Sequence, residues 1–463
     1  MSTITDLTSA LRNFKGDLFH PTDPPYAEAH KIWNAAAQRR PALIARCADI
    51  ADVQLAVKSA AAAGALTAIR CGGHSLAGFS SCENGVVIDL SRLREVSVDP
   101  AARRAKFSGG SLLGTVDQAT QRAGLVFPAG VVSHTGAGGL ILGGGTGWLT
   151  RLLGLSCDNV ESFHMVAADG SLVHASAREN ADLYWALRGG GGNFGVVTEF
   201  EVRLHPLTSV LLACSYCVGD DIFRILHDWR EYMPSASEAL KWNISLRLAP
   251  STPAIPAEIR GTPAASLSLA WFGEPEEGNR VIDRVFSIGK HHAKTKDTMS
   301  FLALQTMADA DFPHGRRYYT KSGYFAQFDD RTMQIMIDAL PSIPAPNTQI
   351  ELAYLGGAAA RVGPTETAFG DRSAPFITNL LADWSDPRED TANVTWVRNL
   401  FAAVRPAMKP GVYVNFMSGD EQERVPEAYH ERWERIVKVK THYDPKNFFN
   451  LNQNIQPQAV RGM

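Results

Sequence analysis

The spacing of apolar and polar residues divides the chain into two parts with different secondary structure. Residues 49–63 are rich in alanine and carry apolar side chains at helical spacing, and the run 67–70 after them is typical of a short buried strand. Further short strands are predicted at 86–90 and 105–108, followed by a helix at 112–123. Strands and helices alternate in this way to about residue 206, which favours an α+β domain.

The part that follows has longer apolar strands and amphipathic helices. Its predicted strands are 210–218, 245–248, 266–272, 323–325 and 350–355, and its predicted helices are 221–232 and 330–339. We expect an antiparallel sheet covered by helices, which forms a roof over the first part. A last helix at 426–440 is expected to return to the first part.

Composition is that of an ordinary globular protein and argues against several partners. The 463 residues are 45% hydrophobic and 20% charged, with a net charge of −3, so we expect no basic surface for nucleic acid or an anionic membrane. No apolar run approaches the roughly 20 residues of a membrane span, and the start lacks the features of a secretory signal, which predicts a cytoplasmic location. Six cysteines are too few for a disulfide scaffold, and their spacing predicts no metal site.

Three glycine-rich runs lie between residues 70 and 197. The first, 70–75, places His74 in a turn directly after a predicted strand, and the others are 136–148 and 188–197. Glycine lets backbone N–H groups approach an anion closely, so such runs suit a dinucleotide with a diphosphate and a flat ring system. For 70–75 alone, a surface turn with a hydrogen-bonded histidine is the alternative. A flexible linker would lack the interleaved Leu, Ile, Trp and Val residues.

Together with residues 443–455, these runs resemble the berberine-bridge-enzyme-like flavin oxidases of the vanillyl-alcohol-oxidase superfamily. The motifs occur in the family's order: RxGGHS at 70–75, SHTGxGGLxLGGGxGWL at 133–149, GLxxDN at 154–159, and WALRGGGGNFGVVT at 185–198. The pattern is most similar to the bacterial subgroup that includes 6-hydroxy-D-nicotine oxidase. The resemblance covers nearly the whole chain.

The family's fold and cofactor imply a role for each part of the chain. Residues 37–206 would form a PCMH-type FAD-binding domain, residues 207–411 a substrate-binding domain, and residues 412–463 a segment that returns to the FAD domain. The histidine of the RxGGHS turn is bonded to the flavin in this family, which implies a covalent FAD on His74. The residues expected to bind the cofactor are Arg70, Cys71, Gly72, Gly73, His74, Ser75, Gly78, Ser133, His134, Thr135, Gly136, Gly138, Gly139, Gly143, Gly144, Gly145, Val197, Tyr413, Asn415, Asn450 and Asn452.

Some relatives attach the flavin a second time, through a cysteine four residues before the glycine of the GxGG turn. That position is Val132 in this chain, so a second link is not expected. Cys157 lies elsewhere in its motif, and a packed thiol is the favoured interpretation. Thr135 occupies the position that controls oxygen access in relatives. It is close to valine in shape, although its hydroxyl adds a polar group, and it favours an oxidase.

The resemblance places a catalytic tyrosine at Tyr413, in a Tyr-x-Asn-aromatic stretch that matches the family pattern. A phenol needs a neighbouring cation or a partner base to act near neutral pH. Glu351, Tyr354 and Lys321 on the predicted roof sheet are candidates for that role. Lys321 shares a strand face with Tyr319, so the two side chains would line the pocket together. A solvated lysine and a core tyrosine are the alternatives.

The predicted reaction is hydride transfer to flavin N5 from a C–H next to O or N, followed by reoxidation by O2 to give H2O2. Alcohols or sugars, amines and aromatic natural products all suit the family. A roof containing Trp271, Tyr319, Phe325 and Tyr354 would favour a flat or aromatic substrate. Arg361 stands where plant enzymes carry a glutamate, which argues against an alkaloid cyclisation. A dehydrogenase that uses another acceptor and a flavoprotein that sequesters a metabolite are the alternative functions.

Overall fold

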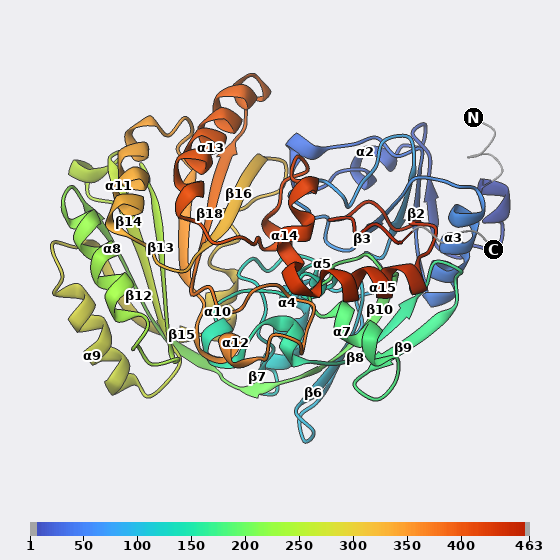
Figure 1. The fold of residues 1–463 in the computed structure, drawn as a ribbon, viewed down its shortest axis with the longest axis horizontal. Helices are drawn as coiled ribbons and strands as arrows, with labels where there is room; N and C mark the ends of the chain where they lie inside the picture. The colour runs from blue at the N-terminus through green and yellow to red at the C-terminus, as the bar shows by residue number, and fades with distance from the viewer. Residues whose placement is uncertain (1–6, 459–463) are drawn as a thin grey trace.

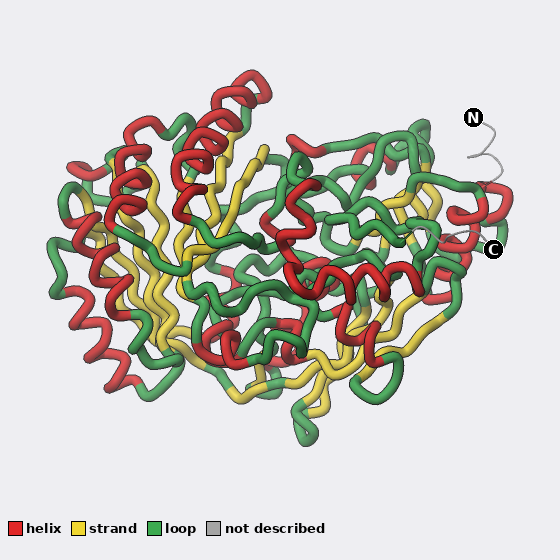
Figure 2. Tube along the Cα trace, viewed as in Figure 1, coloured by secondary structure: helices red, strands yellow, loops and turns green. Residues whose placement is uncertain are grey.

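The computed structural model describes residues 7–458 and arranges them as two regions side by side, each built on its own β-sheets (Figures 1 and 2). The first region holds a four-stranded, a five-stranded and a two-stranded sheet, and the second holds one seven-stranded sheet. Helices pack against these sheets, as expected for the α+β class predicted from the sequence. Within the described residues, no helix has the length and apolar character needed to cross a membrane.

The four-stranded sheet has the order β1-β2-β4-β3, in which β2, β4 and β3 run parallel. Its strands are β1 (Asp17–Phe19), β2 (Leu43–Arg46), β3 (Thr67–Arg70) and β4 (Val86–Asp89). Helix α2 (Tyr26–Ala29) lies between β1 and β2 in the chain, and helix α3 (Ile50–Ala62) lies between β2 and β3. The Asp49 side chain accepts a hydrogen bond from the Asp52 N–H and so begins α3. Helix α3 buries Val53 and Val57, and β3 ends where the turn that contains His74 begins.

The five-stranded sheet is antiparallel, with the order β5-β6-β10-β8-β9. Its strands are β5 (Val96–Asp99), β6 (Arg104–Ser108), β8 (Val160–Val166), β9 (Leu172–Ser176) and β10 (Val196–Arg203), and the short pair is β7 (Leu125–Val126) with β11 (His205–Pro206). The helices of this part are α4 (Leu113–Gln121), α5 (Ala137–Leu142), α6 (Thr150–Leu153) and α7 (Ala181–Leu187). Ile436 and Ile455, from the end of the chain, belong to the same hydrophobic core.

The seven-stranded sheet is antiparallel, with the order β15-β12-β14-β13-β17-β18-β16. Its strands are β12 (Ser209–Val218), β13 (Leu240–Leu248), β14 (Pro263–Trp271), β15 (His292–Ser300), β16 (Arg317–Phe325), β17 (Gln349–Tyr354) and β18 (Phe376–Trp384). The helices of this region are α8 (Asp221–Tyr232), α9 (Pro275–Phe286), α10 (Phe301–Thr306), α11 (Asp330–Ala339), α12 (Gly357–Arg361) and α13 (Asp390–Val404).

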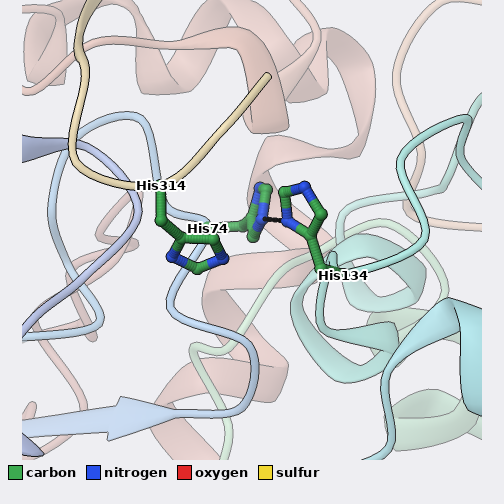
Figure 3. A group of neighbouring side chains, drawn as sticks. All are labelled: His74, His134 and His314. Atoms are coloured by element: carbon green, nitrogen blue, oxygen red, sulfur yellow. Dashed lines mark hydrogen bonds between the residues drawn. The ribbon is translucent and has the colours of Figure 1, made fainter. Parts of the chain in front are cut away.

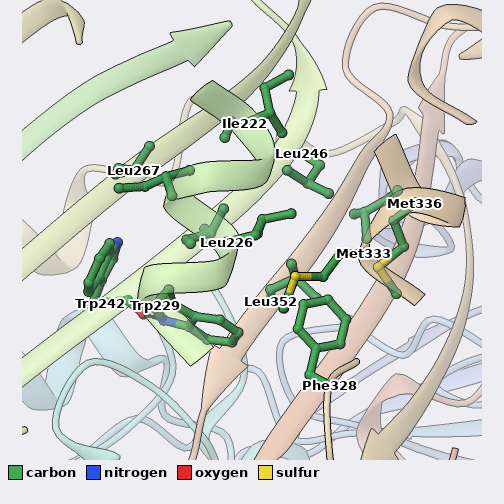
Figure 4. Close-up of a cluster of buried hydrophobic side chains, with 14 of the residues drawn as sticks. Ile222, Leu226, Trp229, Trp242, Leu246, Leu267, Phe328, Met333, Met336 and Leu352 are labelled. Carbon is green, nitrogen blue, oxygen red and sulfur yellow. Dashed lines mark hydrogen bonds between the residues drawn. The ribbon is translucent and has the colours of Figure 1, made fainter. Parts of the chain in front are cut away.

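Helices α8, α9, α11 and α13 cover one side of this sheet, which we name the helix face (Figure 1). Trp242, Leu246 and Leu267 of the sheet pack there against Leu226 and Trp229 of α8 (Figure 4). The sheet therefore has one apolar side that holds the second region together. Its other side faces the first region.

The end of the chain differs from the single helix predicted at 426–440. Helix α14 (Val425–Tyr429) ends at His430, whose φ of 47° is incompatible with a continuing helix, and α15 (Trp433–Tyr443) begins three residues later. Strand β1 lies before residue 37 and pairs with β2. The boundaries at 37–206, 207–411 and 412–463 stay predictions.

Candidate active site

A cavity of about 600 Å³ lies between the two regions. Glycine-rich turns of the first region form one wall, and the seven-stranded sheet forms the opposite wall. We name the side of the sheet that lines the cavity the cavity face. Its residues are Lys241, Asn243, Ser245 and Arg247 of β13, Ser266 and Ser268 of β14, Gln349, Glu351 and Ala353 of β17, and Ile377, Asn379 and Leu381 of β18.

The glycine-rich turns serve two purposes in this wall. A Cβ atom on Gly72 would lie 2.3 Å from the backbone nitrogen of Gly136, so these two turns meet backbone to backbone and exclude side chains. Gly139 and Gly192 instead line the cavity, and a Cβ atom on either would meet nothing within 4 Å. The wall is therefore a bare backbone surface that can approach a large flat or anionic ligand closely.

Most residues predicted to bind the cofactor line this cavity. They are Cys71, Gly72, Gly73, His74, Ser75, Thr135, Gly136, Gly138, Gly139, Val197, Tyr413, Asn415 and Asn452. Val132, which stands where some relatives have a second linking cysteine, also lines it. Cys157 is buried outside the lining, and burial raises the pKa of its thiol strongly, as expected of a packed thiol.

Other predicted cofactor residues support the cavity from behind. Arg70 is buried beneath its turn, where Nη2 donates to Asp89 Oδ2 at 2.8 Å, and Ser133 donates from both its N–H and its hydroxyl to Asp309. Gly78 packs so closely against Ala37 that a Cβ atom would lie 2.6 Å from the alanine Cβ. Asn450 does not line the cavity, because its side chain is exposed and donates to the Asn447 carbonyl, and its role in binding the cofactor stays a prediction.

The glycines at 143–145 position two of the cavity residues. A Cβ atom on Gly143 would lie 2.1 Å from Asn415 Oδ1, and the Gly145 N–H donates to the Tyr413 hydroxyl at 3.0 Å. A Cβ atom on Gly144 would collide with Phe369, which packs against the Tyr413 ring. These glycines therefore leave room for Tyr413 and Asn415 rather than lining the cavity themselves.

His74 is held in a cluster with His134 and His314 beside the cavity (Figure 3). Its Nε2 lies 2.7 Å from His134 Nδ1, and Trp33 stacks on its ring at 4.7 Å. Burial, and then the neighbouring imidazoles, lower the pKa of His74 well below the ordinary value, so the ring is neutral. Nitrogens of the three rings lie within 4.8 Å of one another, a spacing that also suits a metal ion, although the sequence predicted none.

The Tyr413 hydroxyl is fixed by two donors. Besides the Gly145 N–H, Asn415 Nδ2 donates to it at 2.9 Å. Both bonds use the oxygen as acceptor, and the Thr146 side chain also interacts with this hydroxyl. Burial raises the pKa of Tyr413 to about 12, since these two hydrogen bonds only partly offset it.

Glu351 is the predicted roof residue that the structure places in the cavity. Burial raises the pKa of its carboxyl, and a hydrogen bond from Asn379 Nδ2, 2.7 Å from Oε2, partly offsets this. Ser245 of β13 is its partner on one side and Asn379 of β18 on the other. A buried carboxyl with a raised pKa is suited to exchange protons nearer to neutral pH than an exposed one.

Two further candidates on this sheet point away from the cavity. Tyr354 packs edge-on against Phe376 on the helix face, with the Arg151 guanidinium over its ring. Lys321 and Tyr319 do share a strand face, but both side chains bind Asp420 and neither lines the cavity. Strand alternation decides both cases. Tyr354 directly follows Ala353, which lines the cavity, so its side chain lies on the opposite face of β17. Lys321 likewise lies on the face of β16 that is turned away from the cavity.

The expected aromatic roof is also wrong. Trp271 and Phe325 lie in the core of the helix face, and Tyr319 and Tyr354 pack against the same core. The cavity face is polar instead, and Lys241, Asn243, Arg247, Gln349 and Asn379 are residues that sequence reasoning missed. The signal for Lys241, Asn243 and Arg247 was the strict polar–apolar alternation from Lys241 to Leu248, a pattern that strands facing solvent share.

Comparisons with known proteins agree with this geometry. Residues 41–176 match the FAD binding domain model and residues 412–456 match the berberine and berberine-like model. The chain is 31% identical over 442 residues to YgaK, an uncharacterised FAD-linked oxidoreductase of Bacillus subtilis, with 94% of this chain and 95% of that protein covered.

The chain belongs to the berberine-bridge-like family of FAD-linked oxidoreductases. The solved structure of 6-hydroxy-D-nicotine oxidase from Arthrobacter nicotinovorans has a TM-score of 0.86 and 26% identity, over 96% of this chain and 98% of that one. Glucooligosaccharide oxidase of Acremonium strictum, which carries a 6-S-cysteinyl, 8α-N1-histidyl FAD, has the same fold, with a TM-score of 0.86 and 21% identity over 99% of both chains.

The cavity of this FAD-linked oxidoreductase fits the cofactor of its family. Its bare backbone wall offers N–H groups at close approach, and Gly139 and Gly192 open directly into it. Ser80 Oγ and Asn452 Oδ1 line the cavity, are buried, and have no hydrogen-bond partner among the described residues. Such atoms are expected where a polar ligand completes the site. The residues that would hold FAD are therefore those of the glycine-rich turns, with Asn452 from the end of the chain.

Proposed function

We propose that this protein is an FAD-dependent oxidase that removes a hydride from a C–H next to oxygen or nitrogen in a small organic substrate. FAD held by the glycine-rich turns would supply the acceptor for this hydride at N5, with O2 as the final oxidant reduced to H2O2. The observation that carries the proposal is one cavity with a bare glycine wall for the cofactor and a facing wall that holds the buried Glu351 carboxyl. The hydroxynicotine and glucooligosaccharide oxidases named above support this reaction class.

His74 is the residue proposed to carry the flavin. Bond formation at a carbon of the cofactor requires a neutral imidazole with a free lone pair, and burial among two other imidazoles keeps His74 neutral. The 2.7 Å contact with His134 fixes the ring and leaves the His74 Nδ1 atom outside that hydrogen bond.

The link is tested on a denaturing gel viewed under ultraviolet light. Wild type should give a fluorescent band that His74→Ala loses completely. His314→Ala is the matched control, because His314 is an exposed member of the same cluster, and it should keep the band. A band that survives in His74→Ala would place the attachment on another residue.

Glu351 is proposed to accept the substrate proton, and Tyr413 is proposed to orient the substrate for this transfer. Glu351 is the base, since its raised pKa brings it nearer to neutral pH. Tyr413 has too high a pKa to be the base unaided, and it orients the substrate through its fixed hydroxyl. Both groups act on the reacting C–H or on the O–H or N–H beside it.

Tyr413→Phe should slow anaerobic flavin reduction about 10²-fold, within the usual range for a proton-handling side chain, while substrate binding changes less. Tyr324→Phe is the control, because Tyr324 is buried near Tyr413 but does not line the cavity. Unchanged reduction in Tyr413→Phe would remove this residue from the mechanism.

Oxidase behaviour is proposed because Thr135 lines the cavity at the position expected to control oxygen access. Mixing the photoreduced protein with air-saturated buffer should restore the oxidised flavin spectrum within seconds and release H2O2. Reoxidation only by a quinone dye would identify a dehydrogenase. We also propose a cytoplasmic location, which the six unpaired cysteines support.

A further inference from the structure

Lys241 is a buried cation that lines the cavity without a partner. It lies on β13, where every second residue from Lys241 to Arg247 lines the cavity. The residue is 5% exposed, and among residues 7–458 its ammonium forms neither a hydrogen bond nor an ion pair. The neighbouring cavity residue Asn243 also has a buried Oδ1 atom without a partner. Two adjacent polar positions of one strand are thus unsatisfied and face the same space.

The charges around Lys241 increase its need for an anion. The closest charged group that acts on it is Arg151, a second cation whose guanidinium donates to the backbone carbonyls of Ala236, Ser237 and Leu240. Burial, together with Arg151, lowers the pKa of Lys241 to about 7. Taking an ammonium out of water without a counter-charge is unfavourable by several kcal/mol, so such groups usually have a function.

The other charged groups that line the cavity do not neutralise Lys241. Glu351 lies opposite Ser245, four residues further along β13, and the cation whose charge acts on it is Arg247. Asp311 lines the cavity and is exposed, and His74 is neutral. Neither carboxylate acts on the pKa of Lys241, for which Arg151 is the one charged group among the described residues with an effect. Lys241 is therefore a cavity cation that no carboxylate among residues 7–458 pairs with. Arg247, further along the same face of β13, also has no ion pair, and its buried Nε atom has no partner among these residues.

We propose that Lys241 binds a carboxylate of the substrate, so that this enzyme oxidises an organic acid rather than a neutral sugar, alcohol or amine. The Lys241 ammonium complements a carboxylate, whereas the unpartnered Asn243 Oδ1 atom is an acceptor and suits a donor elsewhere on the same molecule. The serines at 245, 266 and 268 then offer hydroxyls to the rest of the molecule. This inference rests on the proposed function, because it names the substrate class of the same cavity.

The test uses the flavin-loaded protein and a matched pair of probes, benzoate and benzyl alcohol, which differ in the carboxylate. Isothermal titration calorimetry at about pH 6 should show benzoate bound at least tenfold more tightly than benzyl alcohol. Raising the pH through about 7 should weaken benzoate binding, because Lys241 loses its proton there while benzoate stays ionised. Equal affinities, no saturable benzoate binding, or no dependence on pH would overturn the proposal.

Variants locate the effect on the side chain. Lys241→Met should remove the preference for benzoate, and Lys241→Arg should keep it and abolish its decline above about pH 7, because arginine stays charged. Lys106→Met removes an equal charge from the exposed surface and should change nothing. If Lys241→Met retains the preference, Lys241 is not the carboxylate site. If Lys241→Met does not fold, the arginine variant and the wild-type pH series decide.

Failure of the proposed function would look different. A protein without flavin, or one whose flavin no organic substrate reduces, would contradict the oxidase proposal. The benzoate titration would still show whether the cavity prefers a carboxylate. Flavin that is present and reducible, combined with indifference to the carboxylate, would contradict only the inference about Lys241.

Discussion

Strand β13 carries apolar residues on one face and polar residues on the other, although none of its residues is fully exposed. Trp242 and Leu246 pack in the helix-face core, whereas Lys241 and Asn243 line the cavity, where the Lys241 ammonium has no ion pair and the Asn243 Oδ1 atom has no hydrogen-bond partner among the described residues. Burial of the first set stabilises the second region, while burial of the second set opposes folding. The comparison teaches that the cavity face was kept for binding at the expense of stability, a common relation in enzyme sites.

Removing the central aromatic residue of the helix face tests that side of the comparison. Trp242→Ala should lower the free energy of unfolding by about 3–5 kcal/mol, because a fully buried indole that packs beside Trp229 is replaced by a void. Thermal unfolding followed by circular dichroism measures the loss. Trp396→Ala, at a partly exposed position, should cost much less. Similar shifts for both would mean that the helix face does not dominate stability.

Removing the buried carboxyl of the cavity face should affect the reaction instead. Glu351→Gln keeps the side chain's size and should slow anaerobic flavin reduction about 10²-fold, with the thermal midpoint nearly unchanged. In wild type the reduction rate should fall as the pH drops through the raised pKa of Glu351, above the range of an ordinary carboxyl, and the variant should lack this decline. Asp311→Asn removes the other, exposed carboxylate of the lining and serves as control. A variant that keeps wild-type kinetics would exclude Glu351 as the base.

Lys241→Met measures how much the buried cation of the cavity face lowers the free energy of unfolding. The folded pKa of Lys241 is about 7 and the unfolded value is about 10.5, so between them the unfolded chain binds more protons and wild-type stability rises with pH. The variant should lack this rise and be more stable than wild type by roughly 1–3 kcal/mol at about pH 6, with the difference fading towards pH 10.5. Melting temperatures of both proteins across this range give the answer. A variant less stable than wild type at pH 6 would show that Lys241 has a partner.

The same two faces explain what the sequence could predict. Helices 221–232 and 330–339 were predicted with their observed limits, because amphipathic helices on the helix face have a clear 3.6-residue period. Strand β15 was missed because it is a mostly exposed and polar edge strand, and β18 because all its residues are buried and its pattern does not alternate. The break between α14 and α15 follows from the positive φ of His430, which cannot be predicted from the residue type.

The site divides in the same way. The glycine-rich turns and His74 could be found from the sequence, because a backbone that approaches a ligand closely requires glycine residues. Lys241 could not, because an alternating strand looks the same whether its polar side faces water or a cavity. Tyr354 was a candidate by residue type and Lys321 by the strand face that it shares with Tyr319. Which face of each strand lines the cavity could not be predicted from the sequence, and both side chains lie on the other face.

The smallest effect is expected where the cavity face is polar but uncharged. Ser245 lies between Ser266 of β14 and Glu351 of β17, and its hydroxyl forms no hydrogen bond among the described residues. Ser245→Ala should therefore change stability by no more than about 0.5 kcal/mol. If this hydroxyl contacts the substrate, the loss of one neutral hydrogen bond should weaken binding about fivefold, near 1 kcal/mol, without altering the rate at saturation. Ser215→Ala is the control, because Ser215 is buried and forms a hydrogen bond with His291 outside the cavity. This variant should lose measurable stability and bind substrate as wild type does. A Ser245→Ala protein that is clearly destabilised would mean that the cavity face, too, contributes to the fold, and the division between the two faces of β13 would not hold.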